Sequence, residues 1–531
     1  MRMKSQIFPI IAIVSFSISI SIRVIPMLTW GVLMYGSGVD QYHHYFLANI
    51  LYTFHYYEKG LAGWTSNYPI GFHLLIAQFA YITGLPLMIT LNVFSGIVIS
   101  FYSLIIFCLV KQVWNSEFAA SLAAVFISLS GGVQAMWSYG LLANLLTVFL
   151  TMLFWFTLFS GWKNGNQTYF FISTTILTMM FLAYFPFWAV FVMILYVLLR
   201  SIRLKRIEME RIEHLFTVFF FSSVISYFAA KKAKVSTPLF EFLSNYLINL
   251  LFRAQTGNKK ALESTAAIDY INSWTLLLLD FEGLIYLIFA IIGFGLAFVY
   301  FLKRKNPDAT AIMAIGMPFL LFLGYFVFAA YFGVLIQLPL ALNFHRTLLS
   351  FSPFLAIFAG ITFEFIYHKL QRLSKIHFGI INLQKIIFIL LIGCILFPTT
   401  AYPLTHSYVY YATSSASLYN TSRMDPELYQ ACLWVTENTR SNSRMVILYP
   451  FMATSSEISV GYSNYLIFYV FTLRRISIHQ LQQDSVTRDY LETTGLINIE
   501  YFVYNEKIGH IVFSDDFQLV YSSKNIKIYQ L

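Results

Sequence analysis

The sequence predicts an α-helical polytopic membrane protein that ends in a small soluble α/β domain. Hydrophobic residues make up 58% of the 531 residues and charged residues only 11%, whereas a soluble chain carries about 25% charge. Apolar runs of membrane-spanning length recur from the N-terminus to about residue 403. Charged residues number 38 in the first 403 residues and 20 in the last 128. We therefore predict a membrane domain over 1–403 and a separate domain over 404–531.

The first apolar run covers 7–30 and follows a short basic segment. It lacks the small-residue cleavage site of a signal peptide, so we interpret it as a membrane anchor. The run 168–200 is either one long span or two short ones broken at Pro186, and two bring the total to about eleven. The remaining spans are expected near 86–110, 117–135, 141–160, 214–230, 273–302, 309–334, 347–368 and 385–403.

Orientation follows from Lys and Arg in the short loops. With eleven spans, the basic segments 200–206, 303–305 and 369–385 share the side of the N-terminus, which predicts a cell-membrane protein with a cytoplasmic N-terminus. The long first loop (31–85), the short 335–346 loop and the 404–531 domain are then extracytoplasmic. The loop 231–272, with six Lys and Arg residues, is an exception on the outer side.

The net charge of +10 comes from these membrane loops, because residues 1–403 hold 25 basic and 13 acidic side chains. It therefore indicates no nucleic-acid partner. The three cysteines are scattered, so neither a disulfide framework nor a thiolate metal site is expected.

The last 128 residues have the size of one small domain. An acidic first turn predicts a helix over 425–439. Short runs rich in β-branched and aromatic residues predict strands over 445–449, 501–504 and 525–529.

Asp40 is the main catalytic candidate, in the first outer loop. If the chain becomes helical there, His43 and His44 follow at i+3 and i+4, on the face of the carboxylate. A carboxylate beside imidazoles can act as a general base or hold a cation. The alternative is that Asp40 caps a helix and that Tyr42 and the histidines are interfacial residues.

Three further candidates lie near the predicted outer face. Arg346, after His345, either extends to the headgroups or binds a phosphate through its guanidinium fork. Arg23 lies within the first span, where a charge is costly unless it is paired or near the interface. Tyr68 precedes an apolar stretch of about 15 residues, which is too short for a comfortable span.

No P-loop, H-E-x-x-H or G-x-S-x-G motif occurs in the sequence, so soluble nucleotide chemistry is not indicated.

The order of several short motifs resembles the membrane glycosyltransferases of the GT-C fold, which use polyprenyl- or dolichyl-phosphate-linked sugars. The resemblance covers nearly the whole chain, and its layout is similar to that of archaeal oligosaccharyltransferase subunits and protein mannosyltransferase-like enzymes. The motifs are Arg23-x-x-Pro26, Asp40-x-Tyr42-His43, Tyr68-Pro-x-Gly71, Arg346 followed by Pro353 and Gly360, Ala431-x-x-Trp-x-x-Glu-Asn-Thr439, and a closing strand over 520–529.

The resemblance implies a transferase acting on the extracytoplasmic face with Asp40 as catalytic base. Arg346, with His345, would contact the lipid phosphate. The other substrate-binding candidates are Tyr42, His43, His44, Tyr68 and Arg23. The implied partners are membrane lipids, a polyprenyl- or dolichyl-phosphate-linked sugar, and a glycan, protein or lipid acceptor. The layout also favours two short spans in 168–200.

Two departures from the family pattern matter. The WWDYG peptide-binding motif of oligosaccharyltransferases should follow the Trp434 helix, yet the sequence there is Val446-Ile-Leu-Tyr-Pro450. The acidic motif of the second outer loop, which helps to bind a metal in some members, is also missing. Both argue against an N-linked oligosaccharyltransferase and against an obligatory metal, so we expect no cofactor, with a divalent metal as the alternative.

Two other functions are compatible with the composition. A solute transporter or lipid-carrier flippase needs charged or broken helices along a path through the membrane midplane, for which Asp280 and Glu364 are the candidates. A non-catalytic scaffold would use the 404–531 domain to bind partners.

Overall fold

The computed structural model describes residues 2–29, 39–54, 70–138, 142–183, 187–232, 284–303, 309–332, 350–374, 393, 426–440, 443–449, 475–481, 485–496, 498–506, 511–523 and 526–531. The chain divides into two compact units. Unit 1 comprises Met1–Gly31 and Tyr56–Thr413, and unit 2 comprises Val32–His55 and Ser414–Leu531. The predicted domain boundary at residue 404 lies outside the described residues and stays a prediction.

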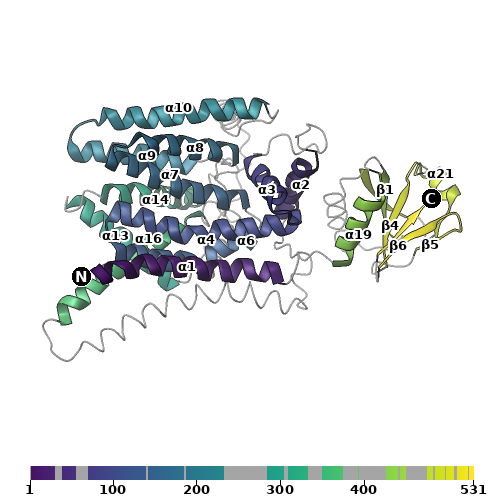
Figure 1. The fold of residues 1–531 in the computed structure, drawn as a ribbon, viewed down its shortest axis with the longest axis horizontal. Helices are drawn as coiled ribbons and strands as arrows, with labels where there is room; N and C mark the ends of the chain where they lie inside the picture. Colours follow the sequence, from purple (N-terminus) through teal and green to yellow (C-terminus); the bar gives the residue numbers. More distant parts are fainter. Residues whose placement is uncertain are drawn as a thin grey trace. The chain divides into compact units, whose positions relative to one another are not determined.

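Unit 1 is a bundle of apolar helices (Figure 1). By length and composition, five of the described helices can cross a membrane, over Ile7–Ile25, Leu87–Trp114, Leu142–Asn164, Met209–Lys231 and Ile285–Leu302. The helices are α1 (Arg2–Thr29), α3 (Gly71–Thr83), α4 (Leu87–Trp114), α5 (Glu117–Ser128), α6 (Gly131–Ser138), α7 (Leu142–Asn164), α8 (Gln167–Ala183), α9 (Phe187–Leu204), α10 (Met209–Lys232), α13 (Leu284–Leu302), α14 (Ala309–Phe332) and α16 (Ser352–Ser374). The predicted class of α-helical membrane protein is confirmed. The count of eleven spans stays a prediction, because 385–403 lies outside the described residues apart from residue 393.

The structure tests the spans predicted over two stretches, 168–200 and 117–135. The run 168–200 forms two helices, α8 and α9, as the alternative with a break near Pro186 predicted. The single span expected over 117–135 is wrong, because α5 ends at Ser128 and α6 begins at Gly131. The backbone N–H of Val133 donates to the Ser130 hydroxyl at 3.1 Å. This serine and the two following glycines favour a helix end over a continuous helix.

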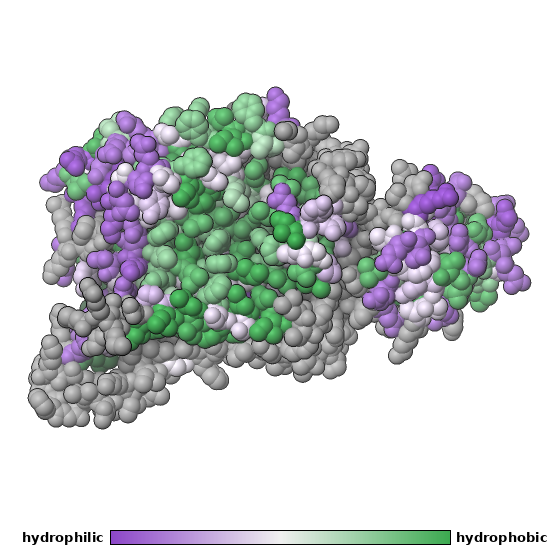
Figure 2. All heavy atoms as spheres, viewed as in Figure 1, coloured by the Kyte–Doolittle hydropathy of each residue, from purple (hydrophilic) through white to green (hydrophobic). Residues whose placement is uncertain are grey.

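Successive long helices of unit 1 alternate in direction (Figure 1). The start of α5 lies beside the start of α1, where the Ser121 hydroxyl donates to the Phe8 carbonyl at 3.2 Å. We call this the basic end, because it carries Lys111, Lys163, Arg200, Arg203, Lys205, Arg206, Arg211, Lys303 and Lys369. Hydrophilic residues gather at that end of the bundle in Figure 2. The other end of unit 1, where α4 and α7 begin, is called the opposite end.

Small residues let the helices of unit 1 approach closely. A Cβ atom on Gly360 would lie 2.6 Å from the Ala119 carbonyl oxygen of α5. A Cβ on Gly293 of α13 would collide with the Phe358 carbonyl of α16. Close backbone approach at small residues is a principal source of helix association within a membrane.

The C-terminal part of unit 2 is built on a five-stranded sheet of order β2-β1-β4-β7-β6. The first three strands in this order are parallel, and β7 runs antiparallel to β4 and β6. The strands are β1 (Arg444–Tyr449), β2 (Arg475–Gln480), β4 (Tyr501–Asn505), β6 (Gln518–Ser522) and β7 (Ile526–Gln530), with a small pair of β3 (Ser485–Val486) and β5 (Val512–Phe513). The predicted strands over 445–449, 501–504 and 525–529 are confirmed.

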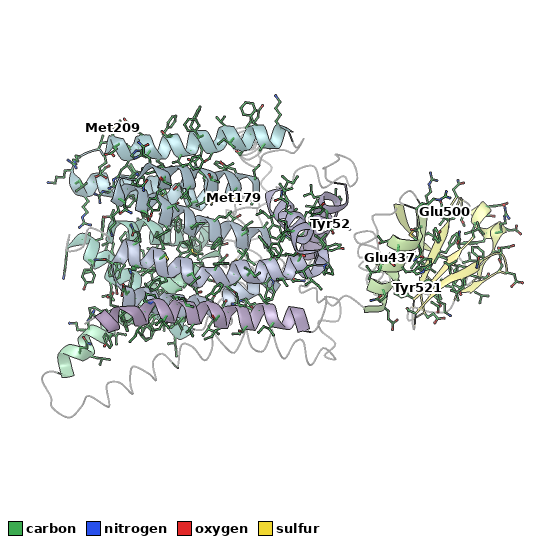
Figure 3. The ribbon with its side chains drawn as sticks, in the orientation of Figure 1. Tyr52, Met179, Met209, Glu437, Glu500 and Tyr521 are labelled. Carbon is green, nitrogen blue, oxygen red and sulfur yellow. The ribbon has the colours of Figure 1, made fainter. Side chains whose placement is uncertain are left out.

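Two helices accompany this sheet. They are α19 (Pro426–Asn438), which confirms the helix predicted over 425–439, and α21 (Arg488–Thr493). Trp434 of α19 packs against Tyr521 of β6 with ring centroids 5.5 Å apart, and Tyr521 is labelled in Figure 3. The core beneath includes Phe502 and Leu491, both fully buried. An α/β domain with its own core is therefore present at the C-terminus.

Replacing glycine by alanine should change the stability of unit 1 in opposite directions at two positions of α13. Gly293→Ala should destabilise unit 1 by about 1–3 kcal/mol, because the added methyl overpacks against the α16 backbone. Gly295→Ala is the matched control, because a Cβ there meets nothing within 4 Å, and alanine favours the helix by roughly 0.5–1 kcal/mol. Thermal unfolding of the two variants in detergent measures both effects. Equal stability of the two variants would contradict the packing assigned to Gly293.

The separate core predicts that residues 404–531 fold alone. Expressed without the membrane part, this segment should be soluble and unfold cooperatively in urea. Phe502→Ala should lower the free energy of unfolding by about 3–5 kcal/mol, because a large aromatic side chain leaves the core.

Reporter fusions after Pro403 test on which side of the membrane the 404–531 segment lies. A cytoplasmic signal would refute the predicted orientation.

Candidate functional site

Arg23 is the most unusual side chain of unit 1, because it is a cation with no solvent exposure. It lies on α1, towards the opposite end. Its Nη1 atom donates to the Ser19 hydroxyl at 2.5 Å and to the Ser128 carbonyl at 2.8 Å. That carbonyl belongs to the last turn of α5, where a helix leaves backbone oxygens without intrahelical donors. The break between α5 and α6 thus provides one anchor of the guanidinium.

The rest of the Arg23 guanidinium is unsatisfied. The Nε and Nη2 atoms are buried and have no hydrogen-bond partner. Among the residues that the structure describes, no carboxylate forms an ion pair with Arg23. An uncompensated buried charge costs several kcal/mol. Within a membrane, such a residue indicates a functional site by default.

Buried polar side chains accumulate at the opposite end of unit 1. They come from α4, α6, α7 and the linker before α6, and include Asn92, Ser95, Ser130, Gln134 and Asn144. The Asn144 amide donates to the Ser350 hydroxyl at 2.8 Å, which ties the start of α7 to a residue two positions before α16. Ser350 lies four residues after Arg346 in the sequence. This end therefore combines a buried cation with several neutral hydrogen-bonding groups.

The glycine at position 96 of α4 helps to hold Arg23. A Cβ atom on Gly96 would lie 3.1 Å from Val24 Cγ2 and 3.6 Å from Arg23 Cβ. Because α4 packs this closely against α1, the stem of Arg23 lies against α4, and its guanidinium reaches the end of α5.

Asp40 lies in the first turn of α2 (Val39–Phe54), so the predicted helical spacing of Asp40, His43 and His44 is present in the backbone. The imidazole of His44 is almost completely buried. The side chains of Asp40, Tyr42 and His43 lie outside the described part of the chain, as do the residues Tyr68, His345 and Arg346. Their predicted roles stay predictions.

Glu364, one of the two acidic residues considered for transport, is held at the basic end. Its carboxylate accepts a hydrogen bond from Trp114 Nε1 at 2.6 Å and lies 3.8 Å from His368. Asp280 lies outside the described residues. These contacts hold Glu364 of α16 against Trp114, the last residue of α4.

The same end holds an aromatic and cationic cluster that the sequence analysis missed. The Arg211 guanidinium lies 5.2 Å from the ring centroid of Trp162 and donates to the Tyr196 hydroxyl at 3.0 Å. Arg211 and Arg200 both bind the Glu208 carboxylate, at 2.8 and 2.7 Å. These contacts join α7, α9 and α10.

Two partners of Arg23 were also missed. Ser19 precedes Arg23 by four residues, a spacing that places both on one helix face and could have been recognised. Ser128 is 105 residues away, and no local signal marks it. Within the described ranges, no group of three or more His, Cys, Asp or Glu residues could hold a metal ion.

Comparisons with known proteins find solved structures of similar arrangement. No family model matches the chain, and no curated protein matches its sequence. A solved structure of similar arrangement is that of ArnT from Cupriavidus metallidurans in the apo state, with a TM-score of 0.48 and 10% sequence identity. The match covers 99% of this chain and 97% of that chain. At this level the likeness carries no argument about activity.

Proposed function

We propose that this protein is a GT-C-like membrane glycosyltransferase. It moves a sugar from a polyprenyl-phosphate-type carrier to an acceptor hydroxyl on the extracytoplasmic face. The observation that carries the proposal is the buried Arg23 at the opposite end of unit 1, because two of its three guanidinium nitrogens have no hydrogen-bond partner. A lipid phosphate is an anionic leaving group at the membrane interface, and a preorganised cation stabilises the charge that develops on it. The resemblance of the motif order supports the same class.

The face of the membrane follows from charge. Arg200, Arg203, Lys205 and Arg206 lie at the basic end, and short loops rich in Lys and Arg stay in the cytoplasm. The opposite end, with Arg23, then belongs to the extracytoplasmic face. This assignment agrees with a lipid-linked donor, whose sugar is transferred outside the cytoplasm.

Asp40 is the proposed base. It takes the proton of the acceptor hydroxyl while the acceptor oxygen bonds to the anomeric carbon. The bond from that carbon to the phosphate oxygen breaks, and the lipid phosphate leaves with the electron pair. The first turn of α2 would present Asp40, with Tyr42, His43 and His44 nearby in the sequence to contact the sugar or the acceptor.

Arg346, with His345, is the proposed partner of the lipid phosphate. The hydrogen bond between Asn144 and Ser350 supports this role, because it holds Ser350, two residues before α16, at the opposite end. Ser350 follows Arg346 by four residues in the sequence. Tyr68 precedes α3 and is proposed to contact the substrate from the first outer loop.

A transporter is less well supported than a transferase. The charged network around Glu364 is confined to the basic end among the described residues. A path through the bundle would need polar groups along its length.

Asp40→Asn should abolish sugar transfer by the purified protein, with a loss of about 10²–10⁴-fold in rate. The amide keeps the size of the carboxylate and removes its basicity, so membrane insertion and donor binding should stay near normal. Asp489→Asn is the matched control, because Asp489 also lies in the first turn of a helix, α21. Wild-type turnover of Asp40→Asn would remove Asp40 from the mechanism. Failure of this variant to accumulate would support the helix-capping interpretation.

Arg346→Ala should weaken binding of a polyprenyl-phosphate sugar by more than tenfold, because removing one side of a buried charged pair costs about 2–5 kcal/mol. Arg346→Lys should restore part of the affinity, since a point charge replaces a bidentate fork. Arg206→Ala, at the exposed basic end, is the control for lost charge. Unchanged donor affinity in Arg346→Ala would show that the side chain only extends to the headgroups.

A further inference from the structure

We infer that Arg23 binds an oxyanion, the phosphate group of a lipid, through the Nε–Nη2 edge of its guanidinium. The inference deepens the proposed function and rests on it for the lipid class. It names a phosphate-binding residue on α1, far in the sequence from Arg346.

The argument begins with which nitrogen atoms are occupied. Nη1 makes both hydrogen bonds of the group, to Ser19 Oγ and to the Ser128 carbonyl. The two atoms without partners are Nε and Nη2. These two nitrogens form one edge of the planar group, with parallel N–H bonds. This edge has the spacing that binds two oxygens of a phosphate or carboxylate at once.

The two hydrogen bonds of Nη1 hold the guanidinium in one orientation, and this orientation fixes where the Nε–Nη2 edge points. Ser19 holds Nη1 from α1 itself, and Ser128 holds it from the end of α5. Gly96 brings the α4 backbone against the Arg23 stem. The guanidinium is thus preorganised on three helices, and little side-chain entropy remains to be lost when an anion binds.

A structural role alone does not account for this arrangement. Replacing a buried ion by a well-packed apolar residue is commonly neutral or stabilising, so a charge with two unsatisfied nitrogens weakens the bundle unless an anion joins it. Among the described residues of unit 1, the carboxylates of Glu117, Glu208 and Glu364 bind partners at the basic end.

The position of Arg23 favours a lipid phosphate as the anion. Arg23 lies six residues before the end of α1 (Arg2–Thr29), in the half of the helix next to the opposite end. The lipid headgroups nearest to it are those at that end, where phosphate is the abundant oxyanion. Lipid phosphate also matches the bidentate fork better than chloride does.

The test measures binding of a polyprenyl monophosphate without sugar to the full-length protein in detergent. The variants are Arg23→Gln, Arg23→Met and Arg23→Lys, and Lys163→Met at the exposed end of α7 is the control for lost charge. Arg23→Gln and Arg23→Met should bind about 30-fold more weakly or worse, and Arg23→Lys should fall between them and the wild type. Lys163→Met should bind as the wild type does. A polyprenol without phosphate should bind all five proteins equally.

Stability provides an independent measurement. Without lipid, Arg23→Met should melt at or above the wild-type temperature, because a desolvated charge is removed. The lipid phosphate should raise the melting temperature of the wild type and leave that of Arg23→Met unchanged. Ser19→Ala should show a smaller loss of affinity, because Nη1 loses one of two anchors, and it serves as the test if the Arg23 variants do not fold.

Three results would overturn the inference. The first is wild-type affinity for the lipid phosphate in Arg23→Gln, or in Ser19→Ala if it is the test variant. The second is competition by inorganic phosphate at the concentration of the lipid, which would make the ligand a soluble anion. The third is a loss of stability in the lipid-free Asp40→Asn variant that disappears when Arg23→Met is present in the same protein. Asp40 would then be the anion that pairs with Arg23. Absence of sugar transfer with any lipid donor, while binding of the lipid phosphate still depends on Arg23, would refute the proposed function alone.

Discussion

Polar groups inside the helices of unit 1 have to find partners within the protein, because hydrocarbon offers none. Most hydroxyls meet this constraint on their own helix, as Ser95 does with the Leu91 carbonyl at 2.8 Å and Thr147 with the Ala143 carbonyl at 2.9 Å. Longer side chains reach across: the Tyr102 hydroxyl donates to the Leu145 carbonyl at 2.5 Å. These contacts let serine and threonine occur throughout an apolar bundle, and they make the incomplete coordination of Arg23 informative.

Charged side chains have different kinds of partners at the two ends of unit 1. At the basic end, Arg200 and Arg211 are both paired with Glu208, and the Arg211 guanidinium also lies over the Trp162 ring. At the opposite end, the Arg23 cation has only neutral partners among the described residues. Paired charges are stable without a ligand. A guanidinium with two unpartnered nitrogens is suited to bind an anionic ligand. The asymmetry therefore separates a structural end from the end proposed to bind substrate.

Close helix contacts make this arrangement rigid. Gly96, Gly293 and Gly360 each sit where a side chain would meet a neighbouring helix. In a membrane, such contacts replace the hydrophobic driving force that holds soluble bundles together. A catalytic site gains from this rigidity, because the orientation of a charged group then costs little when the transition state forms. The separate sheet of unit 2 has a core of its own and does not depend on this packing.

The sequence by itself determined the class of protein and much of the local structure. Composition and the length of the apolar runs predicted helical spans. An acidic first turn predicted α19, and runs rich in β-branched and aromatic residues predicted β1, β4 and β7, because these signals depend on neighbouring residues. Arg23 could be singled out because a charge in an apolar run is conspicuous. The tertiary structure decided which nitrogens of Arg23 are bound, where α5 breaks, and that Asn144 meets Ser350. Such contacts join residues 105 and 206 positions apart, and they follow from the packing of whole helices, which no local pattern encodes.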